Sequence, residues 1–123
     1  MAVSYTSSGA SSSFTLQCAD VTDLENTGLN DLTGTTTVIY SLDLDNAANG
    51  ALTYFKLYDN KTPTYGTDDP SLMIQVAAST RQVWTVAIGL TLSSGISIMA
   101  CTVDGPEAGS SPGSSFNCAL VMT

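Results

Sequence analysis

The chain has 123 residues and carries 11 acidic side chains against 3 basic ones, a formal net charge of -8 at pH 7. Such a charge repels phosphate backbones and anionic lipids, so we expect neither nucleic acid nor a membrane as a partner. Charged residues make up only 11% of the chain, against about 25% in typical globular domains. Ser, Thr, Asn and Gly must cover most of the surface, and a surface with so little charge favours contact with another protein.

The N-terminal sequence MAVSYTSSGASSSF has neither the basic nor the apolar region of a signal peptide. No apolar run approaches the roughly 20 residues of a spanning helix. We therefore expect a soluble protein made in a cytoplasm. Its three cysteines, Cys18, Cys101 and Cys118, are odd in number and far apart, unlike a disulfide framework. We expect all three to be buried, reduced thiols, since they lie in phase with apolar neighbours, as Cys18 and Cys118 do most clearly.

The first segments of the chain are polar. Residues 1–12 hold only isolated apolar side chains, and we expect an extended N-terminal arm that is disordered unless a partner holds it. Residues 13–123 are expected to form a single β-domain. Between 13 and 19, apolar and polar residues alternate, which predicts the first core strand. Residues 20–34 are poor in helix formers, and we expect a loop, with one helical turn as the alternative.

The next two segments have the pattern of a β-hairpin. The run TTTVIYSLDLD begins at Thr35 and ALTYFKLYD begins at Ala51, and both are rich in β-branched and aromatic residues. Between them, Asn49-Gly50 could supply the positive φ angles of a tight turn. We therefore predict that these segments pair with each other.

Four more segments have strand length and a two-residue period, at residues 72–76, 82–90, 95–103 and 115–122. The linker GPEAGSSPGSS at 105–115 is predicted to be a flexible loop, because only Ala108 could anchor it. Short strands, turn-rich loops and the lack of an amphipathic helix predict an all-β fold. We expect an antiparallel β-sandwich or a jelly-roll-like barrel.

Such a fold has strand edges that need protection. Unpaired edges usually carry Lys, Pro or bulges, and here only Lys56, Lys61 and Arg81 are available. Pairing edges with identical subunits would cover them. A homo-oligomer is therefore expected.

The chain has no histidine. This excludes Ser-His-Asp and Cys-His catalysis and most zinc sites. Paired carboxylates are the remaining route to catalysis: Asp43 and Asp45 would lie on one face of a strand, about 6.6 Å apart along it. A glycosidase also needs a deep cleft lined with aromatic residues, and more chain to build it. A solvated strand end is the favoured interpretation, and we expect no catalytic residue.

Two stretches resemble calcium sites in part. LDLDNAANG begins like an EF-hand loop, but Ala47 and Ala48 stand where a ligand and the glycine are needed, and no Glu closes the motif. An irregular site built from Asp59, Asp68 and Asp69 remains an alternative. We expect no metal and no cofactor.

Four aromatic residues have two interpretations each. Trp84 lies near Arg81 in an alternating segment, and both residue types are enriched at binding hot spots. A core position is the alternative that base rates favour for Trp84. The same choice applies to Tyr54, Tyr58 and Tyr65.

The segment from Ala51 to about Asp104 carries a series of short motifs. An apolar strand ends in KLYD, a loop with GTDDP follows, then an aliphatic strand, and then GLTLSSGI before a run that ends in Thr. The matching residues are Lys56, Leu57, Tyr58, Asp59, Gly66, Thr67, Pro70, Gly89, Ser94, Gly95, Ile96 and Thr102. This series resembles a family of small virion structural proteins of tailed bacteriophages, cyanophages among them. It departs from the family at AIGLTLSSG, where a more aromatic segment is usual.

Within that family, the resemblance implies a capsid decoration (cement) protein. Such a protein is made in the host cytoplasm, binds the capsid exterior and is not an enzyme. It is commonly a homotrimer that clamps neighbouring subunits of the major capsid protein. We expect Val3 and Tyr5 of the arm to be contact residues, followed by Arg81 and Trp84.

Three alternatives stay open. The first is a neck, tail, baseplate or fibre-head component of the virion. The second is a receptor- or carbohydrate-binding module, with Tyr54, Tyr58 and Trp84 on one face. The third is a glycan hydrolase that uses Asp43 and Asp45.

Overall fold

The computed structural model describes residues 2–7, 16–34 and 36–123, and the regular elements in these ranges are β-strands. The strands are β1 (Ala2–Ser7), β2 (Gln17–Thr22), β3 (Thr37–Asp45), β4 (Thr53–Tyr58), β5 (Leu72–Val76), β6 (Arg81–Leu92), β7 (Ser97–Cys101) and β8 (Asn117–Met122). Over the same ranges, no helix is long and apolar enough to cross a membrane. The predicted all-β fold class is confirmed.

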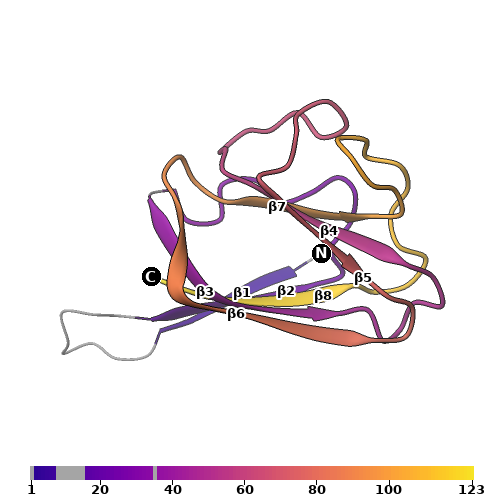
Figure 1. Cartoon of the computed structure of the whole chain (residues 1–123), viewed down its shortest axis with the longest axis horizontal. Coiled ribbons are helices and arrows are strands. Elements are labelled where there is room, and N and C mark those ends of the chain that lie inside the picture. The colour runs from indigo at the N-terminus through magenta and orange to yellow at the C-terminus, as the bar shows by residue number, and fades with distance from the viewer. Residues whose placement is uncertain (1, 8–15, 35) are drawn as a thin grey trace.

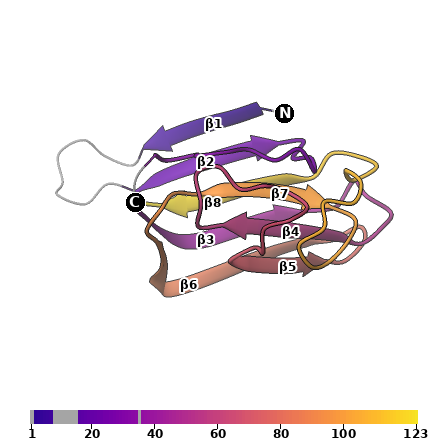
Figure 2. The ribbon, with the colours of Figure 1, turned by 90° about the horizontal axis from the view of Figure 1, so that it is seen from above.

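The strands form two antiparallel sheets that pack face to face (Figure 1). One sheet has five strands in the order β1-β2-β8-β3-β6, and the other has three in the order β5-β4-β7. In the view from above, the three-stranded sheet lies over the β8, β3 and β6 side of the five-stranded sheet, and β1 and β2 extend beyond it (Figure 2). The predicted β-sandwich is confirmed, and the described strands close no barrel.

Alternation along the strands builds one core between the sheets. Every second side chain of β8, and of β3 on each side of its irregularity at Tyr40, faces inward, as in the pairs Leu42 with Leu120 and Leu44 with Cys118. From the other sheet, Phe55 of β4 enters the same core and stacks on Phe116 at a centroid distance of 6.5 Å. The two sheets are thus held together by the apolar side chains of the predicted strand segments.

The predicted hairpin is wrong. β3 pairs with β6 and β8, whereas β4 pairs with β5 and β7, so the intervening residues cross from one sheet to the other. Neither Asn49 nor Gly50 has a positive φ. The tight turn on which the prediction depended is therefore not formed.

The fully buried Asn46 directs this crossing. Its side-chain amide donates to the carbonyl oxygens of Ala51, Val76 and Ala77 at 3.0, 3.2 and 3.0 Å. Its Oδ1 accepts a hydrogen bond from Thr53 Oγ1 at 2.9 Å. Since buried polar groups must be hydrogen-bonded, these contacts fix where the chain leaves one sheet and enters the next.

The N-terminal segment differs from the prediction. Residues 2–7 of the predicted arm form β1, which pairs along β2 from Ala2 opposite Thr22 to Ser7 opposite Gln17. The rest of the arm, 8–12, and the start of the predicted first strand, 13–15, lie outside the described residues. β2 also runs to Thr22, into the region predicted as a loop, and residues 23–34 contain no helical turn.

The segment predicted as a flexible linker is held against the outer face of the three-stranded sheet. The Nζ of the fully buried Lys56 donates to the carbonyl oxygens of Glu107 at 2.6 Å and Asp104 at 3.4 Å. Asn26 Nδ2 donates to the carbonyl of Gly109 at 3.0 Å. Under this cover lies a second, smaller core of Tyr58, Met99, Cys101, Tyr54, Tyr65, Val103 and Ala108.

The three cysteines are free thiols. Cys101 and Cys118 are buried, as predicted, and burial raises the pKa of the Cys118 thiol. Cys18 is only partly buried. The prediction for its face was wrong, because the inward positions of β2 are Ala19 and Val21, which places Cys18 on the opposite face.

Candidate functional site

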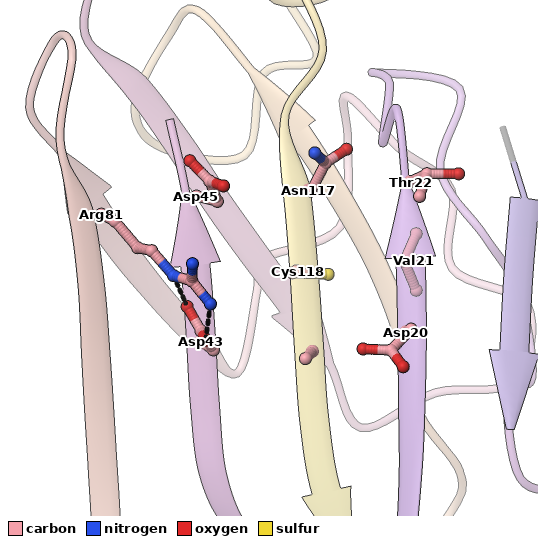
Figure 3. A pocket seen from close by; sticks show the side chains of 9 residues that line it. Asp20, Val21, Thr22, Asp43, Asp45, Arg81, Asn117 and Cys118 are labelled. Carbon is pink, nitrogen blue, oxygen red and sulfur yellow. Dashed lines mark hydrogen bonds and ion pairs between the residues drawn. The ribbon is translucent and has the colours of Figure 1, made fainter. Parts of the chain in front are cut away.

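A hollow of ≈ 240 Å³ lies on the outer face of the five-stranded sheet (Figure 3). Its lining residues come from β2, β3, β6 and β8: Asp20, Val21, Thr22, Asp43, Asp45, Arg81, Asn117, Cys118 and Ala119. Ala119 lies directly between Asp20 and Asp43 in the strand register. Its small side chain leaves the space between these two carboxylates open, and none of the described residues that line the hollow is aromatic.

Asp43 and Arg81 form a two-pronged ion pair across β3 and β6. Arg81 Nε donates to Asp43 Oδ1 at 2.8 Å and Nη2 donates to Oδ2 at 2.6 Å. The hydrogen bonds from Arg81 hold the pKa of the Asp43 carboxyl below its usual value of 3.8, although partial burial opposes this shift. Asp43 is therefore ionised at neutral pH and already has a partner.

This ion pair bears on the hydrolase alternative. Asp43 and Asp45 lie on one face of β3, as predicted, since both line the hollow. However, a general acid for glycoside cleavage needs a raised pKa, and that of Asp43 is lowered. Asp45 Oδ1 accepts a hydrogen bond from the backbone N–H of Ala47 at 2.9 Å, which caps the strand end. The geometry favours structural roles for both carboxylates.

Two carboxylates of the alternative calcium site, Asp59 and Asp68, accept hydrogen bonds in separate turns. Asp59 accepts hydrogen bonds from the backbone N–H groups of Ser94 at 2.7 Å and Ser93 at 3.2 Å, whereas Asp68 accepts one from Thr64 at 2.8 Å. The bond from Ser94 is the main cause that lowers the pKa of Asp59. In the described part of the chain, no group of three or more His, Cys, Asp or Glu residues could hold a metal ion.

β6 forms one edge of the five-stranded sheet, with β1 at the other edge, and among the described strands it pairs only with β3. Large apolar side chains are exposed along it: Val83 is 63% exposed, Trp84 48% and Ile88 94%. The core alternative for Trp84 is therefore wrong. The sequence pattern singled out neither Val83 nor Ile88. The run VWTVAIGL is nevertheless apolar in both phases, so a strand that is covered on only one face must expose some of these side chains.

β6 is regular over only part of its length. Opposite β3, Ser41 pairs with Thr85 and Ile39 pairs with Leu90, so that one β3 residue faces the four residues 86–89. Gly89 in this bulge has a φ of +81°, and a Cβ there would overlap Val38. The bulge, which includes Ile88, divides the edge and leaves Arg81–Thr85 as a flat segment with an unpaired side.

The four predicted contact residues lie at opposite ends of the sheet. Val3 and Tyr5 are on β1, whereas Arg81 and Trp84 are on β6. Val3 packs against the core, and the Tyr5 hydroxyl donates to the carbonyl of Leu32 at 3.0 Å. The two pairs therefore do not form one surface.

The aromatic platform predicted for a carbohydrate-binding module is not formed. Tyr58 is buried, and its ring packs edge-on against Tyr65 at a centroid distance of 5.3 Å. Tyr58 and Tyr54 lie on β4 of the three-stranded sheet, whereas Trp84 lies on β6 of the other sheet. These three side chains cannot present one face to a sugar.

The chain matches no protein-family model, no curated protein and no solved structure. Its function must be inferred from its own residues. Among the described residues, the surface features from which we infer a function are the polar hollow and the apolar edge of β6.

Proposed function

We propose that this chain is a capsid decoration protein of a tailed bacteriophage. It binds the outer surface of the shell and bridges neighbouring subunits of the major capsid protein, without catalysing a reaction. The motif series between Ala51 and Asp104 supports this identity through its resemblance to phage virion proteins. The apolar edge of β6 is the observation that carries the proposal, because it supplies a surface for assembly.

Assembly explains why apolar side chains stand in water at one edge. Covering apolar surface is favourable by about 25 cal/mol per Å², so a partner that covers β6 gains affinity from it. Ile88 projects on the bulge and is 94% exposed, which leaves it almost free of contacts within its own chain. We assign Ile88 to the contact with the shell.

The protein stabilises the shell because its binding is thermodynamically linked to shell assembly. A protein that binds only the assembled, expanded shell shifts the equilibrium away from disassembly by mass action. One domain that touches two capsid subunits gains further from effective concentration, because its second contact is intramolecular. A rigid sandwich with a few apolar anchors is sufficient for this role.

The experiment adds the purified protein to expanded shells that lack it. We expect co-sedimentation at many copies per shell and survival of the shell to a higher temperature. Ile88→Asp should weaken binding at least about tenfold, since it places a charge in a desolvated contact. Asp45→Asn, a change in the hollow, is the matched control and should bind as the native protein does.

Two results would change the assignment. Shells that neither bind the protein nor gain stability would overturn the decoration role. Binding of a few copies at a single vertex would instead identify a neck or tail component.

A further inference from the structure

The flat segment of β6, Arg81–Thr85, has a defined set of backbone groups on its open side. The N–H of Asn46 donates to the carbonyl of Thr80 at 2.9 Å, so the backbone of Thr80 faces β3. The N–H and C=O groups of successive residues point to opposite sides of a strand, and the register with β3 is continuous from Thr85 to Arg81. The N–H and C=O groups of Arg81, Val83 and Thr85 therefore face outward.

The side chains between these positions lie on the inner face of the sheet. Gln82 is opposite Leu44 and Trp84 is opposite Leu42, and both leucines belong to the core. Oε1 of Gln82 is buried and has no hydrogen-bond partner among the described residues. A buried acceptor without a donor costs about 1–3 kcal/mol. The indole N–H of Trp84, two residues away, is a donor on the same face.

We propose that a second copy of this chain pairs its β6 with this segment, antiparallel, about a two-fold axis at Val83. In this register Val83 faces Val83 of the other copy, and Arg81 faces Thr85. This register pairs all five residues of the segment with the same segment of the other copy. Each of the three outward-facing residues takes part in a hydrogen-bonded pair, and each such pair exchanges two N–H···O bonds.

The same register also supplies a donor for Gln82. It places Gln82 of each copy directly opposite Trp84 of the other, in a closely spaced pair with Cα atoms about 4.5 Å apart. With the amide turned toward the partner, Oε1 accepts the indole N–H. Symmetry makes this contact twice, so Gln82 Oε1 of each copy gains the donor that it lacks in the single chain.

The charges permit this approach. β6 contains no carboxylate, and its one charged residue, Arg81, is paired with Asp43 of its own chain. Two chains of charge -8 still repel each other at long range, but salt screens this repulsion beyond about 8 Å at physiological ionic strength. We therefore expect the dimer to become tighter as salt is added.

The contact goes beyond the proposed function and differs from the trimer that the family resemblance implies. A two-fold contact is isologous and joins copies in pairs, whereas a closed trimer needs a heterologous contact. Pairing ends where the bulge begins, after Thr85, and leaves Ile88 free for the shell. Dimerisation and shell binding are therefore separable by mutation.

Sedimentation equilibrium of the full chain across the micromolar range is the test. We expect a reversible dimer, and Val83→Lys should raise its dissociation constant at least about tenfold, because two like charges meet on the axis. Ile88→Asp is the control outside the segment and should leave the dimer intact. Trp84→Phe and Gln82→Met should each weaken it, with the double variant no weaker than either single one.

The negative outcomes are distinct. A monomer throughout the concentration range, or a trimer, overturns the proposal. A dimer that Val83→Lys leaves unchanged, with a native circular dichroism spectrum, places the contact elsewhere and also overturns it. None of these results affects the shell-binding test, which can succeed with a monomer.

Discussion

The two outer faces of the sandwich are built differently. The outer face of the three-stranded sheet is covered by the loops at 59–71 and 103–115, which enclose the second core (Figure 1). On the outer face of the five-stranded sheet, no loop of the described residues covers the hollow, and Asp43 and Asp45 stand beside Arg81 (Figure 3). Among the described residues, the three-stranded sheet therefore has a buried apolar cluster on each of its faces, and the five-stranded sheet has one on its inner face only.

This difference separates stability from binding. On the covered face, polar groups such as Lys56 Nζ are buried and tied to loop carbonyls, so a partner cannot reach them. On the open sheet, both the hollow and the β6 edge are accessible. Substitutions of buried groups on the covered face should change the free energy of unfolding most, and those of the exposed apolar side chains on β6 should change assembly.

The largest expected effect is at Lys56. Lys56→Ala removes a fully buried side chain and leaves the carbonyls of Glu107 and Asp104 without their donor. We expect a loss of about 3 kcal/mol in urea unfolding. Asp20→Asn on the open face is the control, with a change within about 0.5 kcal/mol. Equal losses for the two variants would contradict the distinction between the faces.

The next largest is at Gly28, where a loop meets the covered face. Its φ is +68°, and a Cβ would overlap the ring of Tyr65, whose hydroxyl is fixed by Asn30 Oδ1 at 2.7 Å. Gly28→Ala should therefore cost about 2 kcal/mol. Gly113→Ala has open space and should change stability by less than about 0.5 kcal/mol. If Gly28→Ala instead lowers the free energy of unfolding no more than Gly113→Ala does, the loop is not packed tightly on Tyr65.

The sequence predicted the layers better than their connections. Two-residue alternation identified the segment at 72–76, which is β5 at the same bounds, because burial on one face leaves a local pattern. The pairing partner of β3 depends on contacts distant in sequence. Asn46 reaches carbonyls up to 31 residues away, and no local pattern encodes that reach. The hairpin prediction failed for this reason.

The candidate surface was predictable to a similar extent. The shared face of Asp43 and Asp45 follows from strand period alone. The ion pair with Arg81 requires that β3 and β6 be neighbours, which only the tertiary fold decides. Trp84 was named as a contact candidate, but its exposure depends on β6 being an edge.

Acid should affect the two faces through different carboxylates. The pKa of Asp59 is lowered by backbone N–H groups, and that of Asp43 by Arg81. Because each folded pKa lies below the unfolded value of 3.8, each contribution is complete above about pH 5 and is lost as pH falls through the folded pKa.

Melting temperatures of Asp59→Asn and Asp43→Asn between pH 2 and 7 would measure this. We expect both to melt below the native protein at pH 6, with the differences shrinking below about pH 5. High salt should reduce the difference for Asp43→Asn more, since an exposed ion pair is screened and backbone hydrogen bonds are less so. A salt effect of the same size on both variants would contradict this assignment.

The smallest expected effect is on two neighbouring tyrosines of the covered face, Tyr58 and Tyr65. Replacing each by Phe should change the free energy of unfolding in opposite directions. The Tyr58 hydroxyl is buried without a partner in the described residues, and burial raises the pKa of Tyr58 to about 12. Tyr58→Phe removes an unsatisfied polar group, so we expect it to be neutral or stabilising by up to about 1 kcal/mol.

Tyr65 is the matched comparison, because its ring packs edge-on against Tyr58 while its hydroxyl donates to Asn30 Oδ1. Tyr65→Phe should destabilise by about 1 kcal/mol in the same urea titration. If Tyr58→Phe instead destabilises as much as Tyr65→Phe, the Tyr58 hydroxyl must have a water partner. Water would then reach the second core, and the covered face would be less well sealed from solvent than the packing of its loops indicates.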